Sequence, residues 1–141
     1  MKKIFILCAA ILLSCNNNTK GQTPEAVKKT FQAKYPGEND PDWHQDDHGY
    51  YEAHFKIDGV KYRADFNADG SWVETETSID KKALPKAIKN AIKDNYDDSE
   101  EITEIEKVDS ATKGVFYDVE FKQKGKNKDV EFRADGSIIN A

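Results

Sequence analysis

The chain has 141 residues, of which 33% are charged and 38% hydrophobic, and its formal net charge is −5 at pH 7. This acidic balance excludes the basic surface that nucleic-acid-binding domains need. The length suits one compact domain, or two small halves that share a core.

The first residues, MKKIFILCAAILLSC, have the pattern of an export signal: two lysines, an apolar run, and a small residue before a cysteine. The apolar run Ile4–Leu13 is shorter than the about 20 residues that a membrane-spanning helix requires. We therefore predict a signal peptide over residues 1–14. Cleavage would remove two lysines and leave a more acidic mature chain.

The residues before Cys15, Leu-Leu-Ser, resemble the lipobox of bacterial lipoproteins. This resemblance implies acylation of Cys15 and a polar tether over residues 15–22, and it predicts a periplasmic or outer-membrane lipoprotein. The alternative is an ordinary signal peptide cut a few residues later, which predicts a secreted or soluble periplasmic protein. Because Cys8 would leave with the leader, the mature domain would have no thiol for a disulfide.

The segment TPEAVKKTFQAKYPG, residues 23–37, predicts an amphipathic helix. Pro24 suits the first turn, Val27 and Phe31 lie four residues apart, and the Pro-Gly pair ends the helix. A short strand is expected around Trp43–Asp46.

The segment YYEAHFKIDGVKYRADF, residues 50–66, predicts a β-hairpin, because apolar and polar residues alternate on both sides of Asp58-Gly59. A two-residue loop at Asp-Gly places Phe55 opposite Tyr62 on an apolar face. The next strand is expected at Trp72–Ser78, after the Ala-Asp-Gly-Ser turn.

The second part of the chain repeats the first. FNADGSW at 66–72 recurs as FRADGSI at 132–138, and LPKAIKNAIKDNY at 84–96 matches the first helix. We predict two tandem repeats, residues 23–79 and 80–141, each a helix followed by four antiparallel strands. The fold class is α+β, with both helices packed on one face of the sheet.

The Pro-led helices ending in Tyr and the aromatic-rich hairpins ending in Asp-Gly resemble those of PepSY-like domains. The segments on which this resemblance rests are KTFQAKYPG, LPKAIKNAIKDNY, YYEAHFKIDGVKYRADFNADGSW and VFYDVEFKQKGKNKDVEFRADGSI. The resemblance covers residues 23–141. It implies a curved-sheet fold like that of the beta-lactamase inhibitory protein and an exported, non-catalytic module, but it names no target.

The stretch DFNADGSWVETE fits the calcium loop of an EF-hand, with Asp65, Asn67, Asp69 and Glu76 as candidate ligands. An EF-hand loop joins two helices, whereas this stretch follows a predicted strand. The second copy, EFRADGSIINA, has Arg133 at the third ligand position. We therefore predict a tight turn and no metal.

Other chemistry has weaker support. His44 and His48 could bind zinc or copper, but without a thiol or a third imidazole a solvated loop is the favoured interpretation. No nucleophile elbow, phosphate loop or dinucleotide fingerprint occurs in the chain. We predict a protein that is not an enzyme and needs no cofactor.

The predicted hairpins place like charges opposite one another on the outward sheet face, which destabilises a hairpin unless a cation lies nearby. Water and flanking bases such as Arg63 are the favoured explanation; the hypothesis with functional content is that this face binds a basic protein. The candidate partner-binding face consists of Tyr50, Glu52, His54, Arg63, Asp65, Trp72, Phe116, Asp118, Glu120, Asp129 and Glu131.

The second hairpin has a basic tip, KQKGKNK, at Lys122–Lys128. We interpret it as a solubilising edge; contact with lipid headgroups or with an acidic protein is the alternative.

Together these patterns predict a non-catalytic protein-binding module whose partner is an unknown exported protein. The family resemblance extends this to inhibition or modulation of an envelope enzyme such as a peptidase. The alternative is an envelope protein that binds a small ligand or a metal ion such as calcium. Membrane contact is expected only through the lipid anchor, and no nucleic-acid partner is expected.

Overall fold

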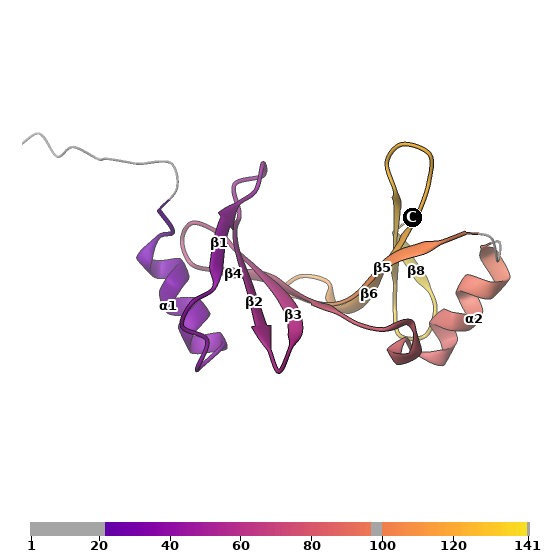
Figure 1. The fold of residues 1–141 in the computed structure, drawn as a ribbon, viewed down its shortest axis with the longest axis horizontal. Helices are drawn as coiled ribbons and strands as arrows, with labels where there is room; N and C mark the ends of the chain where they lie inside the picture. Colours follow the sequence, from indigo (N-terminus) through magenta and orange to yellow (C-terminus); the bar gives the residue numbers. More distant parts are fainter. Residues whose placement is uncertain (1–21, 97–99, 141) are drawn as a thin grey trace, which may run out of the picture.

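The computed structural model describes residues 22–96 and 100–140, and the chain order of its helices and strands is shown in Figure 1. The elements are α1 (Glu25–Lys34), β1 (Asp42–Gln45), β2 (Tyr51–Ile57), β3 (Val60–Phe66), β4 (Trp72–Ser78), the 3-10 helix η1 (Lys81–Ala83), α2 (Lys86–Asn95), β5 (Ile102–Ser110), β6 (Gly114–Phe121), β7 (Lys128–Phe132) and β8 (Ile138–Asn140). A helix followed by four strands thus occurs twice. The predicted signal peptide, Cys15 and most of the predicted tether lie outside the described residues.

The strands form one eight-stranded sheet in which each strand pairs with its neighbours in sequence. The antiparallel arrangement within each half was predicted, whereas the pairing of β4 with β5 was not. In the first hairpin Phe55 lies opposite Tyr62, so the predicted register is confirmed. In the second hairpin Tyr117 lies opposite Phe132. Asp58 and Gly59 have φ values of +51° and +81°. Two positive φ values are what a two-residue type I′ hairpin loop requires.

Each helix covers its own part of the sheet with a narrow apolar stripe. Val27 and Phe31 of α1 are buried against apolar side chains of β2 and β3. Ile88 and Ile92 of α2 are buried against β5, β6 and β7. Burying one such side chain contributes about 2 kcal/mol, and the helices have little other reason to form in isolation.

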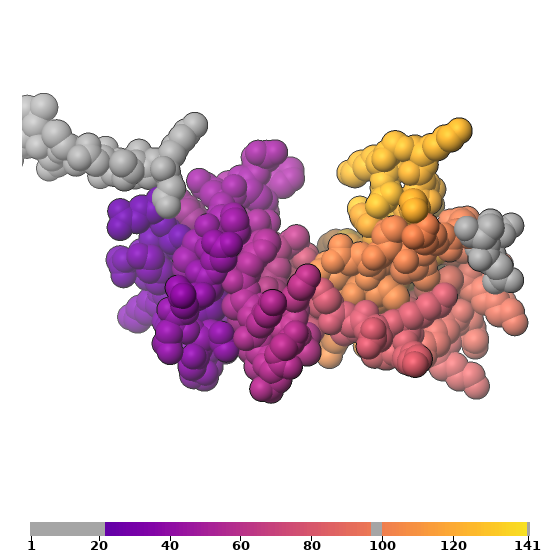
Figure 2. All heavy atoms as spheres, in the orientation of Figure 1, coloured from indigo at the N-terminus to yellow at the C-terminus, as the bar shows by residue number. Residues whose placement is uncertain are grey.

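The two halves are joined through the sheet and have separate cores. β4 pairs with β5 from Glu74 opposite Ser110 to Ser78 opposite Glu106, although α2 lies between these strands in sequence. Figure 1 shows α1 and α2 at opposite ends of a twisted sheet, and Figure 2 shows the halves as two lobes side by side. No helix among the described residues has the length and apolarity to span a bilayer.

The Ala-Asp-Gly-Ser segment forms a tight turn between β3 and β4, which confirms the predicted turn. Gly70 N donates to Asn67 O at 2.9 Å, and Asp69 Oδ1 accepts hydrogen bonds from the backbone N and the hydroxyl of Ser71 at 2.8 and 2.7 Å. Residues 133–137 make the same set of bonds between β7 and β8.

The glycine of each turn packs against the first turn of a helix. Gly70 has a φ of +89°, and a Cβ atom built there would lie 2.7 Å from the carbonyl oxygen of Ala26 in α1. Gly136 has a φ of +88°, and its Cβ would lie 2.8 Å from the carbonyl oxygen of Ala87 in α2. Each of the two positions therefore requires glycine for two reasons: its positive φ and the close approach of the helix backbone.

We predict that Gly70→Ala lowers the free energy of unfolding by about 3 kcal/mol, because positive φ and a backbone clash combine. Gly59→Ala is the matched control: its φ is +81°, but nothing lies within 4 Å of the added Cβ. That variant should lose only about 1 kcal/mol. Urea unfolding followed by tryptophan fluorescence measures both, and equal losses would contradict the packing of the turn against α1.

Candidate functional site

The face of the sheet opposite the helices, called the open face, carries two groups of charged residues. The Arg63 cluster consists of Glu52, Arg63, Asp65, Glu74 and Glu76, from β2, β3 and β4. The Asp118 cluster consists of Glu106, Asp118, Asp129 and Glu131, from β5, β6 and β7. Side chains alternate between the two faces of a strand, so the cross-strand register fixes which of them meet.

In the Arg63 cluster three carboxylates lie in one row across three strands. Glu52 is directly opposite Asp65, and Asp65 is directly opposite Glu74. Arg63 Nη2 donates to Glu76 Oε1 at 2.5 Å, whereas its Nε lies 3.6 Å from Asp65 Oδ1 and 3.9 Å from Glu52 Oε1. One guanidinium therefore faces several carboxylates and bonds to one of them.

In the Asp118 cluster the repulsion between opposed carboxylates is offset to a smaller extent. Asp118 lies opposite Glu106 on one side and opposite Glu131 on the other. Lys113 Nζ bonds to both carboxylate oxygens of Glu131, at 2.7 and 2.9 Å. Asp118 Oδ1 is buried and accepts no hydrogen bond.

Burial raises the pKa of several of these acids. Desolvation raises the pKa of Asp65 to about 6, against an opposing effect of Arg63. Desolvation raises the pKa of Asp118 to about 6 as well, and the negative charges of Asp129 and Glu131 add to it. Glu76 and Glu106 also have raised pKa values, chiefly because both are desolvated. The open face therefore holds protons more tightly than ordinary carboxylates do.

An apolar strip lies beside the contact between the two clusters, where desolvation and the charge of Glu106 raise the pKa of Glu76. Val108 lies opposite Glu76 and next to Phe116, and these two apolar side chains are only 2% and 3% exposed. Lys113 Nζ lies 5.0 Å from the centroid of the Phe116 ring. The strip lowers the local dielectric around the acids but leaves a partner little apolar surface to bind.

The structure divides the predicted partner-binding residues into groups. Glu52, Arg63, Asp65, Asp118, Asp129 and Glu131 lie in the two clusters of the open face. Glu120 lies beside the second cluster and accepts hydrogen bonds from Thr103 and Asn127. These bonds lower its pKa.

Three other predicted partner-binding residues lie outside the two clusters: His54, Tyr50 and Phe116. His54 lies on the open face with its ring centroid 4.7 Å from that of His44. Tyr50 is half-buried and donates its backbone N–H to Asp46 Oδ1 at 2.7 Å, so it closes the β1–β2 turn. Phe116 is on the open face but buried.

The prediction that Trp72 belongs to the partner-binding face is wrong, because Trp72 lies on the helix side of the sheet. An irregularity in the β3–β4 register at Asp65 and Phe66 places Trp72 opposite Phe66, within the apolar cluster of α1. Lys34 Nζ of α1 lies 3.6 Å from the centroid of its ring. Trp72 therefore belongs to the core of the first half and is not available to a partner on the open face.

The sequence did not identify three acids of the open face as members of one site. They are Glu74, Glu76 and Glu106. Glu76 was considered only as the last ligand of a calcium loop. Alternation along β4 and β5 could have placed them on one face, but no tight turn fixes the register between these strands. The pairing of β4 with β5 is the information that was lacking.

The predicted metal candidates are not brought together in the arrangements that the sequence suggested. Asn67 and Asp69 lie in the turn, where Asp69 Oδ1 already accepts two hydrogen bonds. Among residues 22–96 and 100–140, the one group of three side chains with metal-ligand spacing is Asp65, Glu74 and Glu76.

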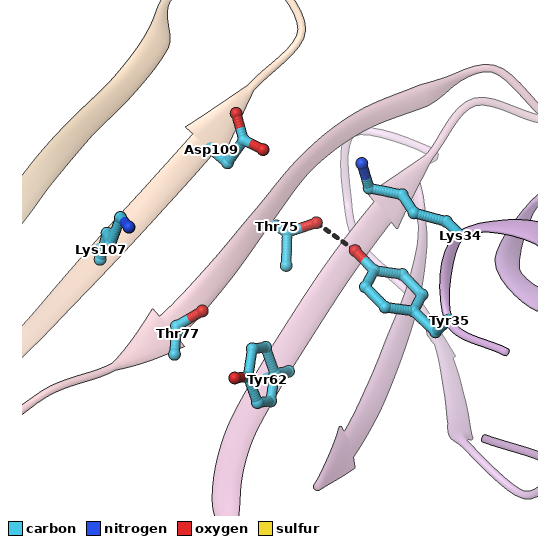
Figure 3. A pocket seen from close by; sticks show the side chains of 7 residues that line it. All are labelled: Lys34, Tyr35, Tyr62, Thr75, Thr77, Lys107 and Asp109. Atoms are coloured by element: carbon cyan, nitrogen blue, oxygen red, sulfur yellow. Dashed lines mark hydrogen bonds between the residues drawn. The ribbon is translucent and has the colours of Figure 1, made fainter. Parts of the chain in front are cut away.

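A hollow lies on the helix side, between the lobes. It has a volume of about 390 Å³ and is lined by Lys34, Tyr35, Tyr62, Thr75, Thr77, Lys107 and Asp109. Figure 3 shows the hydroxyl of Tyr35 bonded to Thr75, and Trp72 Nε1 donates to the same Thr75 oxygen at 3.0 Å. The hydroxyls of Tyr35 and Thr75 thus bond to each other, which is typical of a structural contact.

The basic tip of the second hairpin extends away from the sheet, above β6 in Figure 1. Lys122 Nζ is 2.7 Å from Glu101 Oε2, and Lys128 Nζ is 5.8 Å from the ring centroid of Tyr96. Two of its lysines therefore contact the chain itself. The solubilising role of this tip stays a prediction.

The raised pKa of Asp118 has a consequence for stability. Because its folded-state pKa of about 6 exceeds its unfolded-state value, protonation favours the folded state, and stability falls as pH rises through about 6. Asp118→Asn should therefore raise the free energy of unfolding at pH 8 by about 1 kcal/mol, after allowance for solvent screening, and by less at pH 5.

Urea unfolding at pH 5 and pH 8 measures this difference. Glu120→Gln is the matched control on the same strand, because the pKa of Glu120 is lowered and its removal should give no gain at pH 8. A destabilised Asp118→Asn variant at pH 8 would contradict the proposed repulsion.

Comparisons with known proteins address the fold. A structure described as a DUF2874 family protein from Bacteroides ovatus is 26% identical, with 85% of this chain and 87% of that chain covered and a TM-score of 0.74. A BLIP-like protein from Bacteroides fragilis is 23% identical, with 89% of each chain covered and a TM-score of 0.73. A third, described as one of the "putative periplasmic proteins" of Bacteroides eggerthii, is 21% identical, with 85% and 88% covered and a TM-score of 0.75.

A search of curated proteins gave no match. Residues 49–140 match the family model described as "Putative beta-lactamase-inhibitor-like, PepSY-like". The matched segment spans more than half of the chain and contains β2 to β8 with α2, and the similar structures have the same fold. The chain therefore belongs to the beta-lactamase-inhibitor-like, PepSY-like family.

Proposed function

We propose that the protein is an exported, non-catalytic binding module whose open face binds a basic segment of another exported protein. The observation that carries this proposal is the excess of carboxylates over cations in the Arg63 and Asp118 clusters. Asp65 and Asp118 each have a buried oxygen without a hydrogen bond. Lysine or arginine side chains of a partner would supply the missing donors and remove the repulsion between opposed acids.

The chemistry of the face indicates how such a partner would bind. Val108 and Phe116 are buried, so charge and hydrogen bonds would supply most of the attraction. Association driven in this way is fast and weakens as salt concentration rises. Arg63 and Lys113 would restrict the partner to sequences that avoid these two positive positions.

We further propose that binding inhibits or modulates an envelope enzyme such as a peptidase by covering its surface. This step is supported by the inhibitor-like description of the family and by the BLIP-like name of the Bacteroides fragilis structure. Surface occlusion requires no covalent chemistry and no cofactor. Because fold does not determine target, the enzyme must be identified by experiment.

The location of the protein is part of the proposal. The lipobox resemblance supports a lipid anchor at Cys15, and the description of the Bacteroides eggerthii structure supports the periplasm. A tether over residues 15–22 would hold the domain near the membrane and leave the open face accessible.

We also propose that residues 23–79 and 80–141 are two repeats of one unit. The element order and the hydrogen bonds of the two turns support this. So does the contact of Gly70 with Ala26, which the contact of Gly136 with Ala87 reproduces. A duplicated unit explains why both halves present acids on the same sheet face.

The test is affinity capture from envelope extract with charge-reversed variants. Asp118→Lys with Glu120→Lys should reduce the recovery of a specific partner at least tenfold, and recovery by the wild-type chain should fall as salt is raised. Glu25→Lys with Asp94→Lys is the matched control, because it makes the same change in net charge at exposed positions of the two helices.

Equal recovery by the open-face variant and the wild-type chain would contradict the proposal. Loss of the partner with the helix variant alone would assign binding to the helix side. Circular dichroism of each variant establishes that the fold is intact before recoveries are compared.

A further inference from the structure

We propose that Asp65, Glu74 and Glu76 form a calcium site on the open face, a function beyond the proposed protein binding that uses acids of the same face. One carboxylate oxygen from each of these side chains lies within 4.8 Å of the others. Calcium binds oxygen ligands at about 2.3 to 2.6 Å, so ligands on opposite sides of one ion are about 5 Å apart. The three oxygens are thus close enough to contact a single ion.

Two of the three ligands are buried, and each of these two has one carboxylate oxygen without a hydrogen bond from the described part of the chain. Asp65 is 5% exposed and Glu76 is 8% exposed. Oδ1 of Asp65 and Oε2 of Glu76 accept no hydrogen bond from any described residue. Burying a carboxylate oxygen without a hydrogen bond is unfavourable, and a cation bound by Asp65 and Glu76 would relieve this cost.

Arg63 does not fill this role. Its Nη2 bonds to Oε1 of Glu76, which leaves Oε2 free, and its Nε is 3.6 Å from Asp65 Oδ1 and has no hydrogen-bond partner of its own. Glu52 adds another carboxylate opposite Asp65. A divalent ion beside Arg63 would still be surrounded by an excess of negative charge.

The backbone holds the ligands in a fixed arrangement. Asp65 and Glu74 are direct partners on β3 and β4, and Glu76 lies two residues along β4 on the same face. The pattern differs from the EF-hand interpretation, in which Asn67 and Asp69 would be ligands. Water would complete the coordination from the solvent side.

This geometry favours calcium and sets its affinity. Hard carboxylate oxygens suit calcium, which tolerates irregular coordination, whereas magnesium demands near-octahedral geometry and keeps its water. Three protein ligands without a closed loop resemble the weak sites of extracellular modules. We expect a dissociation constant on the order of 0.1 to 1 mM.

Isothermal titration of the full-length chain with calcium chloride at pH 7.5 tests the site. Asp65→Asn and Glu74→Gln should each weaken calcium binding at least tenfold. Two matched controls lie outside the site: Asp69→Asn, in the EF-hand-like turn, and Asp118→Asn, in the other acidic cluster. Both should bind calcium like the wild-type chain.

Amide chemical shifts of the wild-type chain give an independent readout that does not depend on variants. Calcium should move the signals of residues 65 and 74 to 76 most. No binding at about 10 mM calcium, or wild-type affinity in both Asp65→Asn and Glu74→Gln, would overturn the site. Loss of binding in Asp69→Asn would also overturn it, because the turn would then hold the ion.

Discussion

The pairing of β4 with β5 holds the two halves of the molecule together. It joins two halves that have separate cores into one sheet, although α2 lies between these strands in sequence. The same pairing sets Ser78 beside Glu106 and Glu76 beside Val108, and so it brings the two acidic clusters onto one surface. Without it, each half would carry a short row of acids and no extended face.

The acids of this face lie where a negative charge is unfavourable. Helices cover the opposite face, where apolar side chains pack and stabilise the fold. On the open face, desolvation and opposed negative charges raise the pKa values of Asp65 and Asp118. Natural proteins often accept such a local loss of stability where a surface binds something. The two proposals differ only in the cation that relieves it: a basic side chain of a partner, or calcium.

Much of the fold could be predicted because its signals are local. Asp58-Gly59 fixes the first hairpin, and the duplicated Ala-Asp-Gly-Ser turn shows that the calcium-loop pattern is a turn. The candidate site was predicted only in part, because a site that spans β2 to β7 depends on long-range pairing. The predicted position of Trp72 was wrong for a related reason. A register irregularity beside Phe66 places Trp72 on the helix side, and no residue pattern in the sequence indicates this irregularity.

The carboxylates of the open face are desolvated and have too few cations around them. Carbon-13 NMR titration of the aspartate carboxyl groups measures this most directly. We expect Asp65 and Asp118 to titrate at about 6 in the folded protein, well above the ordinary value of 3.8. Asp69, whose pKa is lowered by Ser71, should titrate below that value. Ordinary values for Asp65 and Asp118 would contradict the account.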